Sequence, residues 1–164
     1  MKASATLVLA GLTACSALPA TAEDKAKSSL YVVDTYDPER NADKDVKEAV
    51  SKAKAGRKHV LLEVGGEWCG WCHLMNKYFK ENDNVAESLA KNYLIVKINY
   101  SKENENKEFL GKYPPIKGYP HIFVLDSDGK LLHSQNTAEL EEGKGYNEAA
   151  VLEFLDKWAP KSQQ

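Results

Sequence analysis

The chain has 164 residues, which suits one domain with a substantial core and is short for two. Its 43% hydrophobic and 28% charged residues are typical of a globular protein. The net charge of −2 gives no electrostatic reason to expect nucleic acid or an anionic membrane surface as a partner.

The first 22 residues have the features of a signal peptide. Lys2 provides a positive start, residues 3–18 carry no charge, and Ala-Thr-Ala at residues 20–22 is a small-x-small cleavage site. The apolar stretch is shorter than the about 20 residues that a membrane-spanning helix needs. We therefore expect residues 1–22 to direct export.

A second way of processing this segment stays open. Leu-Thr-Ala-Cys at residues 12–15 resembles a bacterial lipobox, in which the cysteine becomes the lipidated first residue. In that alternative residues 1–14 are the signal, Cys15 carries the lipid, and residues 16–29 form a tether. The lipid would then be the only contact with a membrane. Both alternatives predict the periplasm or cell envelope, an oxidising compartment.

From residue 30 onward, strand and helix patterns alternate. In chain order, the predicted elements are a strand (30–33), a helix (43–55), a strand (59–64), a helix after residue 72, a helix starting near 82–84, a strand (93–100), a short helix (105–111), two hairpin strands (121–125 and 130–134) and a helix capped by Asn147. The polar segment 137–147 is expected to be a solvated loop. This order predicts an α/β fold whose central mixed sheet has a hairpin at one edge.

The C-x-x-C pair, Cys69 and Cys72, carries the strongest chemical signal. With Cys15 in the signal segment, these are the only cysteines of the folded domain, so they are either a redox dithiol or a ligand set. Two cysteines three apart in the first turn of a helix face the same way and can form a disulfide. The helix N-terminus favours a thiolate. Cys69 lies nearer the solvent and is the expected nucleophile, with Cys72 as the resolving thiol.

The residues around this pair resemble the thioredoxin family. The segment 61–72, LLEVGGEWCGWC, is similar to the family's strand and active-site turn, including the tryptophan before the first cysteine. Residues 97–99 resemble the end of the next strand, and IKGYP at 116–120 resembles the loop whose proline faces the dithiol. The matches keep their order over roughly residues 45–158.

This resemblance implies a thioredoxin-like three-layer fold with helices on both sides of the sheet. The domain is expected over residues 41–160, after an N-terminal extension at 23–40 and before a tail at 161–164. It also implies a thiol–disulfide oxidoreductase that acts on protein thiols and disulfides. Such an enzyme needs no cofactor beyond its own redox-active disulfide.

The resemblance assigns roles to three further residues. Glu63 occupies the place of a buried carboxylate with a raised pKa, which would exchange a proton with Cys72 directly or through water. Lys97 occupies the place of the ammonium that accompanies this carboxylate. Pro120 is expected to be cis. Without the resemblance, a surface Glu63, a solvated Lys97 and a trans Pro120 stay open.

The same resemblance places the substrate site around the dithiol. The expected substrate-binding residues are Trp68, Gly70, Trp71, Tyr119 and Pro120. The backbone of Tyr119 would pair with an extended segment of the substrate, a contact that accepts many sequences.

Two other functions remain possible for the cysteine pair. Cys69 to His73 also fits C-x-x-C-H, the attachment motif of c-type haem, with His73 as one axial ligand and Met75 as a candidate for the other. Alternatively, Cys69 and Cys72 could bind copper or zinc together with His73 or His121.

The direction of electron flow is open between reduction, oxidation and isomerisation. Gly70 and Trp71 supply no cation between the cysteines that would strongly stabilise a thiolate. We therefore expect a reducing or intermediate potential and a membrane protein that supplies electrons.

Overall fold

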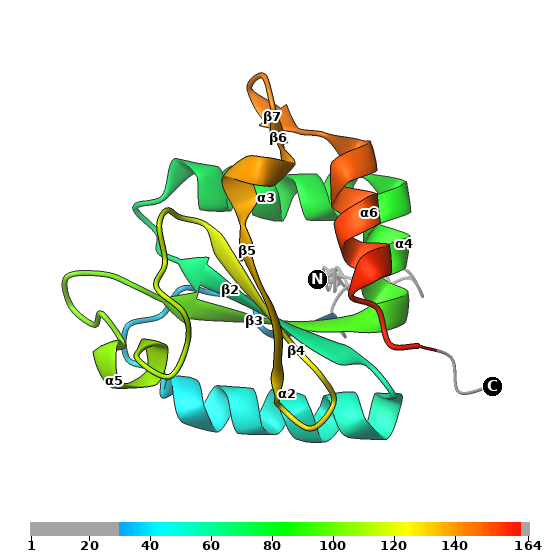
Figure 1. Cartoon of the computed structure of the whole chain (residues 1–164). Coiled ribbons are helices and arrows are strands. Elements are labelled where there is room, and N and C mark those ends of the chain that lie inside the picture. The colour runs from blue at the N-terminus through cyan, green and yellow to red at the C-terminus, as the bar shows by residue number, and fades with distance from the viewer. Residues whose placement is uncertain (1–29, 162–164) are drawn as a thin grey trace, which may run out of the picture.

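The computed structural model describes residues 30–161, and its centre is a five-stranded mixed sheet (Figure 1). The strands lie in the order β1-β3-β2-β4-β5. Their bounds are β1 Tyr31–Val33, β2 His59–Gly65, β3 Tyr93–Asn99, β4 His121–Leu125 and β5 Leu131–Asn136. The strands β1, β3 and β2 are parallel to one another, and β4 and β5 continue the sheet in antiparallel pairing.

The two central parallel strands are buried along nearly their whole length. All residues of β3 are buried, and in β2 only His59 is partly exposed. Parallel strands that are covered on both faces read as continuous apolar runs. This explains why both strands stand out in the sequence as largely apolar segments, each with a single charged residue, Glu63 in β2 and Lys97 in β3.

Helices cover both faces of the sheet and form the outer layers. α2 (Ala42–Gly56) lies on one face, and α3 (Gly70–Glu81), α4 (Asp83–Asn92) and α6 (Glu148–Lys157) lie on the other (Figure 1). The short α5 (Lys107–Leu110) lies in the connection between β3 and β4. Each face has its own apolar core: one contains Val46 and Ala49 of α2, and the other contains Phe79, Leu89 and Leu155. The predicted three-layer fold is confirmed.

Asparagine side chains mark the starts of three helices. Asn41, Asn82 and Asn147 each accept a hydrogen bond from a backbone N–H in the first turn of α2, α4 and α6, respectively. Such caps satisfy N–H groups that have no partner within the helix. The predicted caps near residue 82 and at Asn147 are thereby confirmed.

The segment 137–147 is ordered, and the prediction of a solvated loop was wrong. It forms the 3₁₀ helix η1 (Thr137–Leu140) and a hairpin of β6 (Glu141–Glu142) and β7 (Gly145–Tyr146). Leu140 and Tyr146 are buried in the core on the α3 side. The sequence between Leu140 and Tyr146 is mostly charged or glycine, and two apolar residues six positions apart do not form a periodic pattern. The sequence therefore gives no indication that these two side chains are buried.

The predicted N-terminal extension at residues 23–40 contains β1, which pairs with β3 at one edge of the sheet, so the sheet begins before residue 41. The proposed signal segments 1–22 and 1–14, the tether 16–29 and Cys15 lie outside the described residues. Within residues 30–161, no helix is both long and apolar enough to cross a membrane.

Candidate active site

Cys69 and Cys72 form a disulfide at the N-terminus of α3, with their Cα atoms 5.3 Å apart. Cys69 is the N-cap residue, and its sulfur accepts a hydrogen bond from the Cys72 N–H at 3.2 Å. Cys72 is fully buried, whereas Cys69 is 4% exposed. Cys69 is therefore the sulfur that an incoming thiol can reach, and the helix N-terminus stabilises it when it leaves as a thiolate.

The turn between β2 and α3 brings the backbone very close to the disulfide. A Cβ atom on Gly65 would lie 2.4 Å from the Cys72 sulfur and 3.2 Å from the Tyr36 hydroxyl oxygen. A Cβ atom on Gly66 would lie 2.4 Å from the Trp68 ring nitrogen and 2.8 Å from the Tyr100 carbonyl oxygen. Both glycines are required because no side chain fits between the strand and these groups.

Gly65→Ala should lower the free energy of unfolding of the oxidised protein by about 1–3 kcal/mol, the usual cost of overpacking a core. The disulfide holds the Cys72 sulfur in place, so it cannot move away as a flexible side chain would. Chemical denaturation followed by circular dichroism measures this change. Gly70→Ala is the matched control, because a Cβ atom there meets nothing within 4 Å. Equal stabilities of the two variants would contradict the close approach at Gly65.

Glu63 lies in the middle of β2, and only 1% of it is exposed. Its Oε1 accepts a hydrogen bond from the Tyr36 hydroxyl at 2.5 Å, and its Oε2 has no hydrogen-bond partner. Burial raises the pKa of Glu63, and the hydrogen bond from Tyr36 and the charge of Lys97 oppose this only in part. The carboxyl is thus buried, as the resemblance implied, and a surface position is excluded.

Lys97 lies opposite Glu63 in the register of β2 and β3, but its ion pair is with another residue. Its ammonium donates to the carbonyl oxygen and to Oδ1 of Asp34, each at 3.0 Å, and to Oδ1 of Asn76 at 3.1 Å. The structure contains no hydrogen bond between Lys97 and Glu63 within the described chain. Lys97 therefore acts on the carboxyl through space, while Asp34 holds the ammonium.

Tyr36 is a site residue that sequence reasoning missed. It is 4% exposed and packs with Cys69, Cys72 and Tyr119. Tyr36 precedes an Asp-Pro turn and belongs to no periodic pattern. The sequence therefore does not indicate that it contacts the two cysteines. The short strand β1 and the turn that follows bring it there from 27 residues before Glu63.

Three aromatic residues pack in series next to the active-site turn, and Tyr119 among them contacts the cluster that contains the disulfide. Trp68 meets Tyr119 edge to face, Tyr119 stacks on Tyr100, and the Trp68 ring nitrogen donates to the Tyr100 carbonyl oxygen at 2.7 Å. The Tyr119–Pro120 peptide bond is cis, as predicted. The Pro120 carbonyl oxygen accepts a hydrogen bond from the Thr137 hydroxyl. The loop is thereby fixed against the start of η1.

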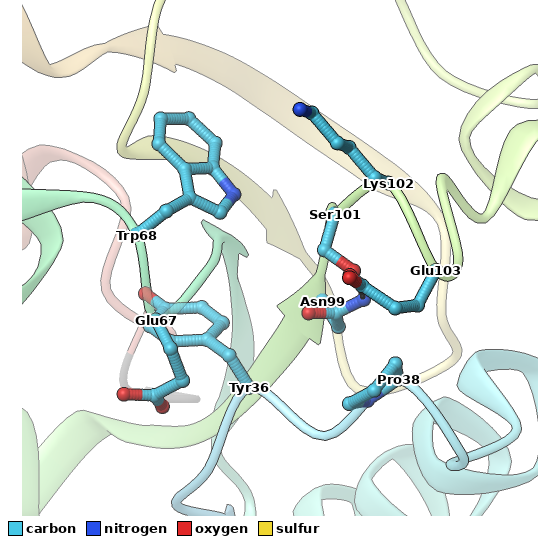
Figure 2. Close-up of a pocket in the computed structure, with 8 residues that line it drawn as sticks. All are labelled: Tyr36, Pro38, Glu67, Trp68, Asn99, Ser101, Lys102 and Glu103. Atoms are coloured by element: carbon cyan, nitrogen blue, oxygen red, sulfur yellow. Dashed lines mark hydrogen bonds between the residues drawn. The ribbon is translucent and has the colours of Figure 1, made fainter.

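Next to these rings is a hollow of about 380 Å³. Tyr36 and Trp68 lie on one side of it, and the loop containing Ser101, Lys102 and Glu103 lies on the other (Figure 2).

Trp68 and Trp71, which flank Cys69, are the large hydrophobic side chains that stay exposed within residues 30–161, at 58% and 36%. Trp71 packs edge to face on Tyr146 of the β6–β7 hairpin. Gly70, between Cys69 and Trp71, is open to solvent. The reactive sulfur therefore lies within an apolar surface.

The candidate haem ligands do not fit that role. His73 is exposed, and its Nε2 lies 2.8 Å from the Glu67 carbonyl oxygen. Met75 is fully buried in the core beneath α3. Residues two apart on a helix point in nearly opposite directions, so the two side chains cannot face one haem plane.

A metal site would need a third ligand beside the cysteines. His121 is buried, and its Nε2 lies 2.9 Å from the Ser134 hydroxyl oxygen, while burial lowers its pKa to about 4. The part of the chain that the structure describes contains no group of three or more histidine, cysteine or acidic side chains placed to hold a metal ion.

Comparison with known proteins agrees with this geometry. Residues 41–127, more than half of the chain, match the thioredoxin-like family. The chain belongs to this family. The crystal structure of a disulphide isomerase from Xylella fastidiosa Temecula1 is similar over 74% of this chain and 94% of that one, with 30% identity and a TM-score of 0.64.

Two further similarities involve a protein with the printed name thiol:disulfide interchange protein DsbD. The protein from a Pseudomonas strain is 27% identical over 66% of this chain and 17% of its own length. The C-terminal domain of DsbD from Neisseria meningitidis shares the fold, with 22% identity, a TM-score of 0.51 and coverage of 71% of this chain and 96% of that domain. The chain spans less than a fifth of the length of the curated relatives it matches.

Proposed function

We propose that this protein is a thiol–disulfide oxidoreductase that exchanges disulfides with other proteins through Cys69 and Cys72. The observation that carries the proposal is the disulfide at the N-terminus of α3, in which Cys69 is slightly exposed and Cys72 is fully buried. Names of relatives with this fold, a disulphide isomerase and DsbD, support the same chemistry.

In the reducing direction, Cys69 attacks as a thiolate. Its sulfur forms a bond with one sulfur of the substrate disulfide, and the other substrate sulfur leaves as a thiolate. Cys72 then loses its proton and attacks Cys69, which forms the internal disulfide and releases the second substrate sulfur. Glu63 takes up the proton from Cys72, because burial raises the pKa of this carboxyl and makes it a stronger base than an ordinary carboxylate.

A protein substrate fits the surface around Cys69 better than a small disulfide does. Trp68 and Trp71, on either side of Cys69 in the chain, expose apolar area, and the Tyr119 ring of the neighbouring loop packs against Trp68. Aromatic side chains with exposed faces are enriched where proteins bind one another. An extended substrate segment that pairs with the backbone of Tyr119 would be bound regardless of its sequence. Preference among substrates would then come from contacts with the two tryptophans.

The proposed direction is reduction, and the proposed place is the periplasm or cell envelope. Between the cysteines, Gly70 and Trp71 supply no cation, so the reduced form gains less stabilisation than in a strong oxidant. A reductase in an oxidising compartment needs electrons from elsewhere. We therefore include a membrane protein as electron donor, and a signal segment at residues 1–22 or 1–14 as the route of export.

A redox titration tests the direction. The Cys69–Cys72 couple, equilibrated with glutathione or dithiothreitol buffers and followed by thiol alkylation, should have a potential nearer about −270 mV than about −120 mV. Reduction of insulin by the dithiothreitol-charged protein tests the activity itself. If the protein catalyses insulin reduction but its potential lies near about −120 mV, the proposed exchange activity is supported and the proposed reducing direction is wrong.

A further inference from the structure

The contacts of Tyr36 connect the buried carboxyl with the buried sulfur. On one side, the Tyr36 hydroxyl donates to Glu63 Oε1 at 2.5 Å. On the other side, the hydroxyl oxygen and the Cys72 sulfur lie 3.2 Å and 2.4 Å from a single point, the Cβ position that Gly65 leaves empty. The Tyr36 oxygen is thus hydrogen-bonded to Glu63 and lies at most 5.6 Å from the Cys72 sulfur, within the same buried cluster.

Tyr36 cannot serve as an ordinary titrating base at this place. Burial and the nearby Glu63 raise its pKa far above the usual value of a tyrosine, so the hydroxyl stays protonated. A neutral hydroxyl can still accept a proton while giving up its own, since it has one hydrogen and two lone pairs. It can thus pass a proton on without ionising.

From this geometry we infer that Tyr36 relays the proton between Cys72 and Glu63. In the resolving step, the Cys72 thiol proton moves to the Tyr36 oxygen while the Tyr36 proton moves to Glu63 Oε1. The Cys72 electron pair forms the bond to Cys69, and the bond from Cys69 to the substrate sulfur breaks, leaving a substrate thiolate. In the oxidising direction the same path runs backwards. This inference rests on the proposed exchange activity.

Neighbouring residues hold Tyr36 in this position. The Lys97 ammonium lies 5.4 Å from the centre of the Tyr36 ring, and Asp34, two residues before the tyrosine, binds that ammonium. The ring also forms part of the wall of the hollow beside Trp68 (Figure 2). Tyr36 and Asp34 precede residue 41, where the match to the family begins, whereas Lys97 lies within it.

Tyr36→Phe tests the relay, because it removes one oxygen and keeps the ring. We expect the resolving step to slow by on the order of 100-fold at neutral pH, within the range of acid–base catalysis. The hydrogen bond from Tyr36 lowers the pKa of Glu63. Its loss should therefore shift the midpoint of the pH–rate profile upward, and the relay further predicts that the slowing persists on the plateau above this midpoint, where Glu63 is ionised in both proteins. Stopped-flow mixing of the reduced protein with a fluorogenic peptide disulfide separates the formation of the mixed disulfide from its resolution.

Two further variants keep the result interpretable. Tyr93→Phe is the matched control, since it removes a buried hydroxyl that donates to the Leu155 carbonyl oxygen, remote from the disulfide. It should leave both phases unchanged. In the Glu63→Gln background, Tyr36→Phe should add little, because a relay without its acceptor is already interrupted.

The two possible failures are distinguishable. If the unaltered protein forms no mixed disulfide with the peptide, the proposed activity itself is wrong. If it reacts in two phases and Tyr36→Phe matches it in rate and pH midpoint, only the relay is overturned. Fully additive effects of Tyr36→Phe and Glu63→Gln would also overturn the relay, because independent residues cannot share one proton path.

Discussion

Cys72→Ser should convert the protein into a trap for its substrates. Cys69 remains accessible at the N-terminus of α3, so it still attacks a disulfide and forms a mixed disulfide. Without the second thiol, this intermediate cannot resolve internally. Intact-mass spectrometry after incubation with oxidised glutathione or insulin should show one stable adduct per chain, and turnover should fall to the rate without protein.

Cys69→Ser is the matched control for this experiment. The remaining Cys72 is fully buried, so a disulfide in solution cannot reach its sulfur. We expect neither adduct nor turnover from this variant under the same conditions. Adduct formation by Cys69→Ser and not by Cys72→Ser would reverse the roles assigned to the two sulfurs.

Glu63→Gln should stabilise the oxidised protein at high pH. The pKa of Glu63 is higher in the folded protein than its ordinary value of 4.5, so the folded state keeps a proton that the unfolded chain releases. The contribution of Glu63 to stability is thus greatest below pH about 4.5 and is lost as the pH rises through its folded-state pKa. Glutamine has no such titration.

The advantage of glutamine should therefore appear above pH about 4.5 and reach a plateau above the folded-state pKa. Each unit of the pKa shift corresponds to about 1.4 kcal/mol of this plateau. Urea denaturation of the oxidised form across this pH range measures the difference without interference from free thiols. Glu153→Gln, on the exposed side of α6, is the control and should show no such pH-dependent gain. Parallel curves for Glu63→Gln and the unaltered protein would show that Glu63 titrates like an exposed carboxyl.

The local parts of the site could be predicted from the sequence. Cys69, Cys72 and Glu63 lie within ten residues on one strand, one turn and one helix, whose geometry fixes their relative positions. Pro120 was recognised through the family resemblance of its loop. The order of strands and helices was likewise readable from the spacing of apolar residues.

The parts that depend on distant contacts could not be predicted. Tyr36 and Asp34 reach the site through the pairing of β1 with β3, and Asp34 binds an ammonium 63 residues further along the chain. A single tyrosine or aspartate before a turn forms no sequence pattern from which a contact with a distant residue could be predicted. The family resemblance places Lys97 beside Glu63, and it gives no sign that the ammonium forms its ion pair with Asp34.

The attachment of β1 has a consequence for the motion of the site. β1 is a three-residue strand at the edge of the sheet, and short edge elements are among the first to open by local fluctuation. Opening would withdraw Tyr36 and uncover Glu63, while α3 would still hold both sulfurs in place. The disulfide would then remain intact, but proton transfer between Cys72 and Glu63 would change. The reactivity of the cysteines therefore depends on the local opening of β1, a strand that contains neither cysteine.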